Sequence, residues 1–452
     1  MNVLKIKKIT LALALISGSI FTMNAQAQAI IYSGTPGSMN FGPNTISNIT
    51  GQASGSTIGY SITAFTNGAT ITGSNINLGV AGHSSNLTFG PTSSTLTGSF
   101  LITSVGSTLG FLLAGRPGGI LDITNLVITN GLAPTGPSLI NTQASVQNTA
   151  QALQGTYTLQ NSVLANSFSY DCNVFGENNV CVSAGGRNTA VSATNGLNNT
   201  SALLIAAYRA MANVRVGAYA DQNLSVNNGG STVNLGNNTP LLGLFGAWNE
   251  NLDGTGTEVK VSAAYGQKNT TINRQVVGSG TTASEAGLGS SQLNSQGVQA
   301  TAKYGFAVTG DVLVSPYVGI RYTQNNMGGY TEGSSASVTT PLTYSALNTN
   351  ATTALAGVGV SYRGIPQTTL FASAGVETDT NTANGSYNAT GLTGLTPVNF
   401  NPNPVTTRPT AMLGASYDVE KNQRLGVTGI YRQEAYQATA TTTVMATYTV
   451  GF

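Results

Sequence analysis

The sequence predicts an all-β protein whose C-terminal part, residues 179–452, is an antiparallel transmembrane β-barrel of about twelve strands. Three observations predict this fold. Apolar residues alternate with polar or small ones throughout residues 179–452, so that each segment has one apolar and one polar face. Short and long connections alternate between the segments, which is typical of membrane barrels. The chain also ends in an alternating segment that closes on an aromatic residue, Phe452.

The composition agrees with a barrel better than with a soluble domain. Charged residues make up 7% of the chain, against about 25% in ordinary globular domains. Hydrophobic residues reach 40%, which is too many for a polar disordered chain. Mean hydropathy is +0.06, near zero as expected where apolar and polar residues alternate. After the first residues, no apolar run of about eighteen residues predicts a transmembrane helix.

Residues 1–29 are expected to be a secretory signal peptide. Lys5, Lys7 and Lys8 form a positive start, an apolar stretch follows at 9–21, and small residues flank Gln26 and Gln28 as in cleavage sites. Lys and Arg number 17 and Asp and Glu 15, so removing this peptide leaves a nearly neutral, slightly acidic chain. Such a chain lacks the positive charge that nucleic-acid binding requires, and we expect no nucleic-acid partner.

Two further regions precede the barrel. Residues 30–136 are rich in Gly, Ser, Thr and Asn, with β-prone runs at Ser61–Phe65 and Ser99–Val105, and show no fixed repeat. Residues 137–178 are predicted to be a linker that contains an α-helix from 138 to about 166. Its polar face carries Gln and Asn without charge, which suits a watery pore. The apolar positions at helical spacing are Ala144, Val146, Ala150, Leu153, Tyr157 and Leu164.

Within the barrel region, alternation places the expected strands. Val298–Val308, for example, has Val, Ala, Tyr and Phe on one face and Gln, Thr, Lys and Gly on the other. Aromatic residues lie toward the ends of such apolar faces, as in interfacial girdles. We expect long loops near 225–238, 277–291, 325–348 and 381–406. The predicted strands are 180–193, 200–210, 213–224, 239–250, 257–276, 292–308, 311–324, 349–362, 367–380, 407–418, 422–434 and 437–452.

Cys172 and Cys181 are the two cysteines of the chain. Because an exported chain meets an oxidising compartment, we expect them to form a disulfide that closes a small loop. Two thiols and one distant histidine are too few ligands for a metal site, and no metal is expected.

The last strand and one internal segment resemble known sequences. Val444, Ala446, Tyr448, Val450 and Phe452 share one face, which is similar to the C-terminal strand that the barrel-assembly machinery recognises in bacterial outer-membrane proteins. The strand 313–322 has a proline followed by a tyrosine, and Glu332 follows in the loop. This pattern, with the signal peptide, helix and C-terminal barrel, resembles the autotransporters of type V secretion over residues 138–452.

The resemblance implies a function for each region. The barrel would export residues 30–136, a small β-rich passenger, to the cell surface, and Gln143–Asn166 would remain as the pore helix. Implied partners are outer-membrane lipid and lipopolysaccharide, the general secretion pathway and the barrel-assembly machinery. The passenger, about 107 residues long, is far shorter than many in this family. Some members cleave themselves between two adjacent asparagines in the helix, but residues 138–166 contain no such pair, so no catalytic residues are predicted for cleavage.

Charged residues on the non-apolar faces are expected to line the lumen, because Lys or Arg facing lipid costs about 2–4 kcal/mol at the membrane midplane. Two roles are open for them: contact with the pore helix, or hydration of the lumen and mutual charge balance. These residues are Arg215, Lys260, Lys303, Arg321, Glu377 and Arg432.

The sequence contains no pattern for catalysis. His83 is the single histidine, and a serine hydrolase would need it beside a G-x-S-x-G elbow, which is absent. Asp122 is the one acidic residue in 30–136, so a paired-carboxylate site lacks candidates. The glycine-rich turn 115–119 lacks the Lys-Ser/Thr of a nucleotide loop. We therefore expect neither an enzyme nor a cofactor.

Two function classes remain. The first is an autotransporter-type protein that displays a short passenger of adhesive or interaction type, whose ligand the sequence does not identify. The alternative is a porin-like channel with a periplasmic or plugging N-terminal domain, since an open barrel of about twelve strands conducts and a helix-filled one does not. A soluble all-β enzyme or lectin is disfavoured by the last strand and the loop asymmetry.

Overall fold

The computed structural model describes residues 137–452, apart from 193–196, 228–231, 237–238, 280–282, 336, 403 and 436–438, together with nine strands between residues 30 and 130. The predicted signal peptide, His83 and the turn at 115–119 lie outside the described residues. The chain divides into two compact units, 1–138 with 278–284, and 139–277 with 285–452. Each unit is described by itself.

The described strands of the first unit form two antiparallel sheets. The predicted run Ser61–Phe65 lies within β4, and the run that begins at Ser99 overlaps β7. One sheet contains β1 (Ile30–Gly34), β2 (Gly37–Asn40), β4 (Thr57–Thr66), β7 (Ser94–Leu101) and β9 (Ile120–Asn130). The other contains β3 (Gly42–Asn48), β5 (Asn75–Leu78), β6 (Ser85–Asn86) and β8 (Thr108–Leu113).

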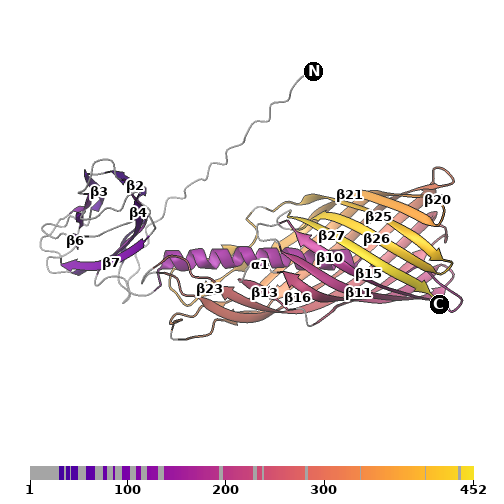
Figure 1. The fold of residues 1–452 in the computed structure, drawn as a ribbon, viewed down its shortest axis with the longest axis horizontal. Coiled ribbons are helices and arrows are strands. Elements are labelled where there is room, and N and C mark those ends of the chain that lie inside the picture. Colours follow the sequence, from indigo (N-terminus) through magenta and orange to yellow (C-terminus); the bar gives the residue numbers. More distant parts are fainter. Residues whose placement is uncertain are drawn as a thin grey trace, which may run out of the picture. The chain divides into compact units, whose positions relative to one another are not determined.

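The second unit is a closed antiparallel barrel of twelve strands, which confirms the predicted fold class (Figure 1). Each strand pairs with its neighbours in sequence, and β10 pairs with β27 to close the barrel. The strands are β10 (Val180–Val191), β11 (Asn198–Met211), β12 (Val214–Asn227), β14 (Leu241–Asn249), β15 (Gly256–Arg274), β16 (Gly287–Ala307), β17 (Val312–Met327), β20 (Leu347–Ile365), β21 (Thr368–Asn384), β25 (Thr407–Glu420), β26 (Gln423–Gln433) and β27 (Ala440–Gly451).

A glycine allows close contact at the closing seam. A Cβ at Gly185 of β10 would lie 2.2 Å from the carbonyl oxygen of Ala446 in β27. The register runs from Cys181 opposite Gly451 to Val191 opposite Thr441. Because the crowding atom belongs to the backbone, it cannot rotate away, and a side chain at this position would push the two strands apart.

Alternation along the strands separates an apolar outer face from a polar interior. In β17 the side chains of Val318 and Ile320 are exposed, while Arg321 between β16 and β20 is buried. The last strand follows the same rule: Val444, Ala446, Tyr448 and Phe452 are exposed and Val450 is half-buried. Exposed apolar side chains in a ring are what contact with lipid requires. No helix in the described part of the chain has the length and hydropathy of a membrane-spanning helix.

The strands and loops differ from expectation on the side of the long connections. β15 agrees with the predicted strand 257–276, whereas β16 begins at Gly287, five residues before the predicted start at 292, in a polar stretch where apolar residues no longer alternate. The long connections also hold short strands that were not predicted. These are β13 (Val233–Leu235), β18 (Tyr330–Thr331), β19 (Thr343–Tyr344), β22 (Ser386–Tyr387), β23 (Ala389–Thr390) and β24 (Val398–Asn399).

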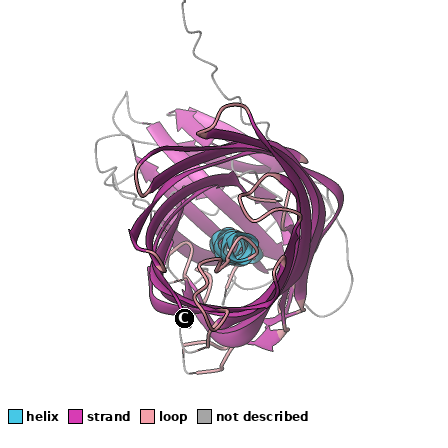
Figure 2. Cartoon of the chain, turned by 90° about the vertical axis from the view of Figure 1, so that its right-hand side faces the viewer, coloured by secondary structure: helices cyan, strands magenta, loops and turns pink. Residues whose placement is uncertain are grey.

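The helix α1, Leu139–Ser167, runs inside the barrel, as Figure 2 shows, and confirms the predicted pore helix. Pro137 and Ser138 precede it, and both residue types favour a helix start. It ends where the Ser167 hydroxyl donates to the Leu164 carbonyl and the Ser169 amide to the Asn166 carbonyl. Its first and last turns carry no charge, so no charged side chain has to be dehydrated in the lumen at these turns.

Candidate functional site in the barrel lumen

The N-terminal half of α1 packs among the long loops. Its apolar side chains Val146, Leu153 and Tyr157 are buried in one cluster with residues of the loop strands. The Tyr157 ring meets Phe400 edge to face at 4.9 Å, and its hydroxyl donates to the Leu347 carbonyl at 2.8 Å. Tyrosines 330, 344 and 387 stack in the same cluster, with ring centroids 4.6 and 4.7 Å apart. These loops therefore hold the helix at the end of the barrel that carries the long connections.

The C-terminal half of α1 is buried but bonds through polar groups. The Asn161 amide donates to the Glu434 carboxylate at 2.9 Å. Further along, Ser162 bonds to Thr441 at 3.1 Å and Asn166 to Thr443 at 2.9 Å, both on β27. Polar groups buried in a lumen are stabilised when they are bonded in this way. Asparagines of the kind that the sequence predicted on the polar face thus contact the wall directly, and a serine does so as well.

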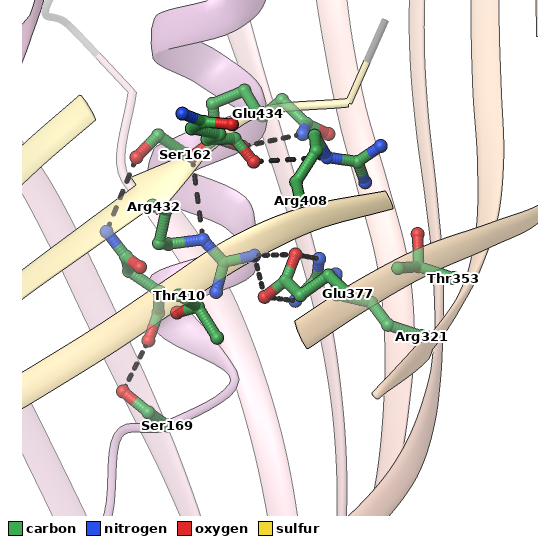
Figure 3. A network of polar contacts seen from close by, with 12 residues as sticks. Ser162, Ser169, Arg321, Thr353, Glu377, Arg408, Thr410, Arg432 and Glu434 are labelled. Carbon is green, nitrogen blue, oxygen red and sulfur yellow. Dashed lines mark hydrogen bonds and ion pairs between the residues drawn. The ribbon is translucent and has the colours of Figure 1, made fainter. Parts of the chain in front are cut away.

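Glu434 connects the helix to a charged cluster on the wall (Figure 3). It also accepts from Thr441 at 2.8 Å and lies 3.5 Å from the Arg432 Nε. Arg432 donates to Glu377 at 2.8 Å, and Arg321 binds the same carboxylate from the other side. All four charged side chains are buried. Glu377 therefore stabilises two buried arginines, and Glu434 connects this cluster to α1 through its hydrogen bond with Asn161.

The linker after α1 covers one wall of the lumen. Cys172 and Cys181 are joined by a disulfide with Cα atoms 5.8 Å apart. Phe168, Tyr170 and Val174 pack against apolar residues of β11, β12, β14 and β15. The linker is thereby fixed to the wall at the end of the barrel that carries the short turns.

Polar contacts reinforce this attachment. Asp171 binds Arg215 at 2.6 Å, and Lys260 lies 3.5 Å away. Burial alone would raise the pKa of Asp171, but the positive charges of Lys260 and Arg215 lower it to about 2. Lys260 also donates to the carbonyls of Ser169 and Tyr170 at 3.2 and 2.7 Å.

Three buried ion pairs in the lumen were not predicted. Arg187 binds Asp221, Arg274 binds Glu332 and Arg408 binds Asp379, with both oxygens of each carboxylate in use. Each pair joins strands or loops far apart in sequence, so only the register brings the charges together. The alternating pattern could have placed the strand residues of these pairs inward, but not Glu332, which lies in a predicted long loop, and it could not have identified any of the partners.

The structure places all six predicted lumen charges around one internal cavity. Of the two open roles, charge balance describes Glu377, whose carboxylate binds both Arg321 and Arg432. Lys303 pairs with Glu258 at 3.1 Å and is partly exposed. No hydrogen bond from these six residues to α1 occurs among the described residues; Arg215 and Lys260 bind the linker just after it. The direct helix contact comes from Glu434, which sequence reasoning missed.

The site has the chemistry of a filled pore. Among the described residues, no group of three or more His, Cys, Asp or Glu side chains could hold a metal ion. The carboxylates of the charged cluster are bound to arginines and so are not free to act as a general acid or base. The arrangement holds a helix and linker inside a barrel.

Comparison with known proteins agrees with this geometry. The family model described as Autotransporter beta-domain matches residues 181–432, more than half of the chain. The chain therefore belongs to the autotransporter family. No curated protein matches it in sequence.

Solved structures similar to this chain include two autotransporter domains. One is the translocator domain of autotransporter NalP from Neisseria meningitidis, with 19% identity, a TM-score of 0.47 and coverage of 67% of this chain and 96% of that chain. Another is the transport unit of the autotransporter AIDA-I from Escherichia coli, with 12% identity, a TM-score of 0.37 and coverage of 66% and 98%.

Family membership defines the second unit. It is an outer-membrane autotransporter barrel of the type V secretion class, a domain for secretion and anchoring rather than for catalysis. The predicted autotransporter family, the barrel fold with a helix inside, and the outer-membrane location of the barrel are confirmed.

Proposed function

We propose that the barrel exports residues 30–136 and anchors them at the cell surface as a short passenger. The observation that carries this proposal is the direction of α1. Its N-terminal end lies among the long loops, where Gln143 bonds to Thr396 at 3.1 and 2.9 Å. Because long loops face outward in outer-membrane barrels, the chain that precedes residue 139 leaves the barrel on the cell-surface side.

The passenger is proposed to act by adhesion or another binding interaction. Its described strands form sheets rich in Gly, Ser, Thr and Asn, and residues 30–136 contain a single Asp and a single Arg. Such a surface would bind through hydroxyl, amide and backbone groups rather than through charge. The ligand is a partner outside the cell, and the barrel itself lies in outer-membrane lipid and lipopolysaccharide.

Protease shaving of intact cells tests the export proposal. An epitope tag near Ser56 should be lost while the barrel stays in the membrane fraction, and a periplasmic marker protein should survive in the same cells. If the tag is lost only after the outer membrane is opened, residues 30–136 are periplasmic. The porin-like alternative would then replace the export proposal.

We also propose that the general secretion pathway carries the chain to the periplasm and that the barrel-assembly machinery recognises its last strand. The Phe452 side chain is exposed, while its backbone bonds to Val180 and Asn178. Phe452→Ala should therefore leave the stability of the refolded barrel unchanged and reduce barrel assembly in cells. Equal assembly of this variant and the parent protein would contradict recognition through Phe452.

A further inference from the structure

The outward face of the barrel changes its chemistry toward the long connections. On the short-turn side of Tyr265 and Tyr322, the strands β15, β16 and β17 expose apolar side chains such as Val261, Val298 and Ile320. On the long-loop side of these tyrosines, the outward positions of the same strands hold amides instead. Since side chains two apart share a face, these amides continue the surface that contacts lipid. Because long connections face outward, they lie at the level of the headgroups of the outer leaflet.

The strand register aligns these amides into rows that cross neighbouring strands. Gln296 lies opposite Gln324, and its amide donates to the Gln324 carbonyl at 2.8 Å. Asn294 accepts a bond from the Tyr265 hydroxyl at 3.2 Å, where the amides meet the aromatic residues. The rows, which we call the amide belt, are Gln296, Gln324 and Asn350; Gln267, Asn294, Asn326 and Asn348; and Asn269 with Gln292.

Charge is nearly absent from the outer surface around the amide belt. Among the described barrel residues, every charged side chain of the long-loop half is buried, with the exception of Glu285. The Glu285 carboxylate accepts bonds from Thr339 at 2.6 Å and Thr340 at 2.7 Å. The buried charges of this half are Arg187, Asp221, Lys268, Arg274, Glu332, Asp379, Arg408 and Glu434. At the short-turn end, by contrast, the exposed residues include Asp311, Arg363, Glu420 and Lys421.

We propose that the amide belt binds the core sugars of lipopolysaccharide through hydrogen bonds between neutral groups. An amide donates and accepts hydrogen bonds, and a sugar hydroxyl does the same, so the two are complementary. A phosphate is bound instead by Arg or Lys, or through a divalent cation that carboxylates hold, and the belt contains none of these. Binding should therefore require the core sugars and be independent of divalent cations. The inference rests on the proposed orientation of the barrel, which protease shaving tests separately.

Native mass spectrometry of the full-length purified protein in detergent tests this inference. The protein is mixed with equal amounts of lipopolysaccharide that has a complete core and of lipid A, which has phosphates but no core sugars. The ratio of the two protein–glycolipid complexes is then measured. The double variant Gln292→Ala, Asn348→Ala removes two exposed amides of the belt, and Asn251→Ala, an exposed amide on a short turn, is the matched control.

We expect the complete glycolipid to be preferred by about tenfold, since one neutral hydrogen bond changes an equilibrium by roughly 2- to 10-fold. The preference should persist when EDTA removes divalent cations, fall toward equal binding in the double variant, and remain in Asn251→Ala. Equal binding of the two glycolipids by the parent protein would overturn the proposal. So would a preference that EDTA abolishes, a preference that the double variant leaves unchanged, or a dimer that forms through the belt in place of the glycolipid complex.

Discussion

Removal of the Asn161 side chain should destabilise the packing of the C-terminal half of α1 against the barrel wall. Asn161→Ala deletes the bond to Glu434, in which donor and acceptor are both almost fully buried and the N···O distance is 2.9 Å. A hydrogen bond to a charged group contributes about 1.5–3 kcal/mol. Since about 1.4 kcal/mol corresponds to a factor of ten, local opening of α1 should become roughly 10- to 150-fold more frequent.

Hydrogen–deuterium exchange of peptides from α1, followed by mass spectrometry, measures this opening. Asn148→Ala is the matched control, because Asn148 lies in the same helix but is exposed. Both variants gain the same helix propensity from alanine, so their difference isolates the buried bond. Glu434→Gln should act through the same contact, and the double variant should therefore show less than the sum of the two effects. Exchange in Asn161→Ala that is no faster than in Asn148→Ala would refute the reasoning.

Three other predictions concern the wall and the linker. Gly185→Ala should reduce the heat-modifiable, folded fraction on gels because its Cβ would lie 2.2 Å from a backbone oxygen of β27, whereas Gly186→Ala, with 3.6 Å to its nearest neighbour, should not. Glu377→Gln leaves two buried arginines without their shared carboxylate and should lower the free energy of unfolding in lipid vesicles by about 3–5 kcal/mol; a loss below about 1 kcal/mol would contradict the proposed role. Asp171 lies outside the strands and its pKa is lowered from 3.8 to about 2, so its stabilisation of the linker is complete above pH 4 and should disappear as pH falls from about 4 to 2. Linker proteolysis by an acid-active protease should rise over that interval, and a flat profile would exclude Asp171 as the cause.

Alternation made the barrel predictable from sequence. A strand with lipid on one side and water on the other, such as β17, must alternate apolar residues like Val318 and Ile320 with polar ones. The strand can therefore be recognised from its own sequence, without knowledge of the strand that pairs with it. The helix was predictable because Val146, Leu153 and Tyr157 recur at helical spacing while charge is absent. The six inward charges followed from the cost of placing charge in lipid. Their partners did not, because pairing depends on register.

The features that sequence reasoning missed depend on contacts between distant residues. β18 and β19 have two residues each, too few to show a period. They form because Tyr330 and Tyr344 stack with each other and with a third loop. Glu434 closes the predicted strand 422–434 and lies two residues after Arg432, so alternation could have placed it inward. The sequence does not indicate that its partner is Asn161, 273 residues earlier in the chain. The Asp221–Arg187 pair likewise spans 34 residues.

The position of α1 inside the barrel is most directly tested by cross-linking it to the wall. In Ser162→Cys, Thr441→Cys the two thiols replace hydroxyls that lie 3.1 Å apart, one on the helix and one on β27. In the control pair, Ser162→Cys with Val444→Cys, the second cysteine faces outward. We predict that the first pair forms a disulfide in intact cells, seen as a mobility shift on non-reducing gels, and that the control pair does not. Equal cross-linking of the two pairs, or none in either, would contradict a helix held against β27 in the lumen.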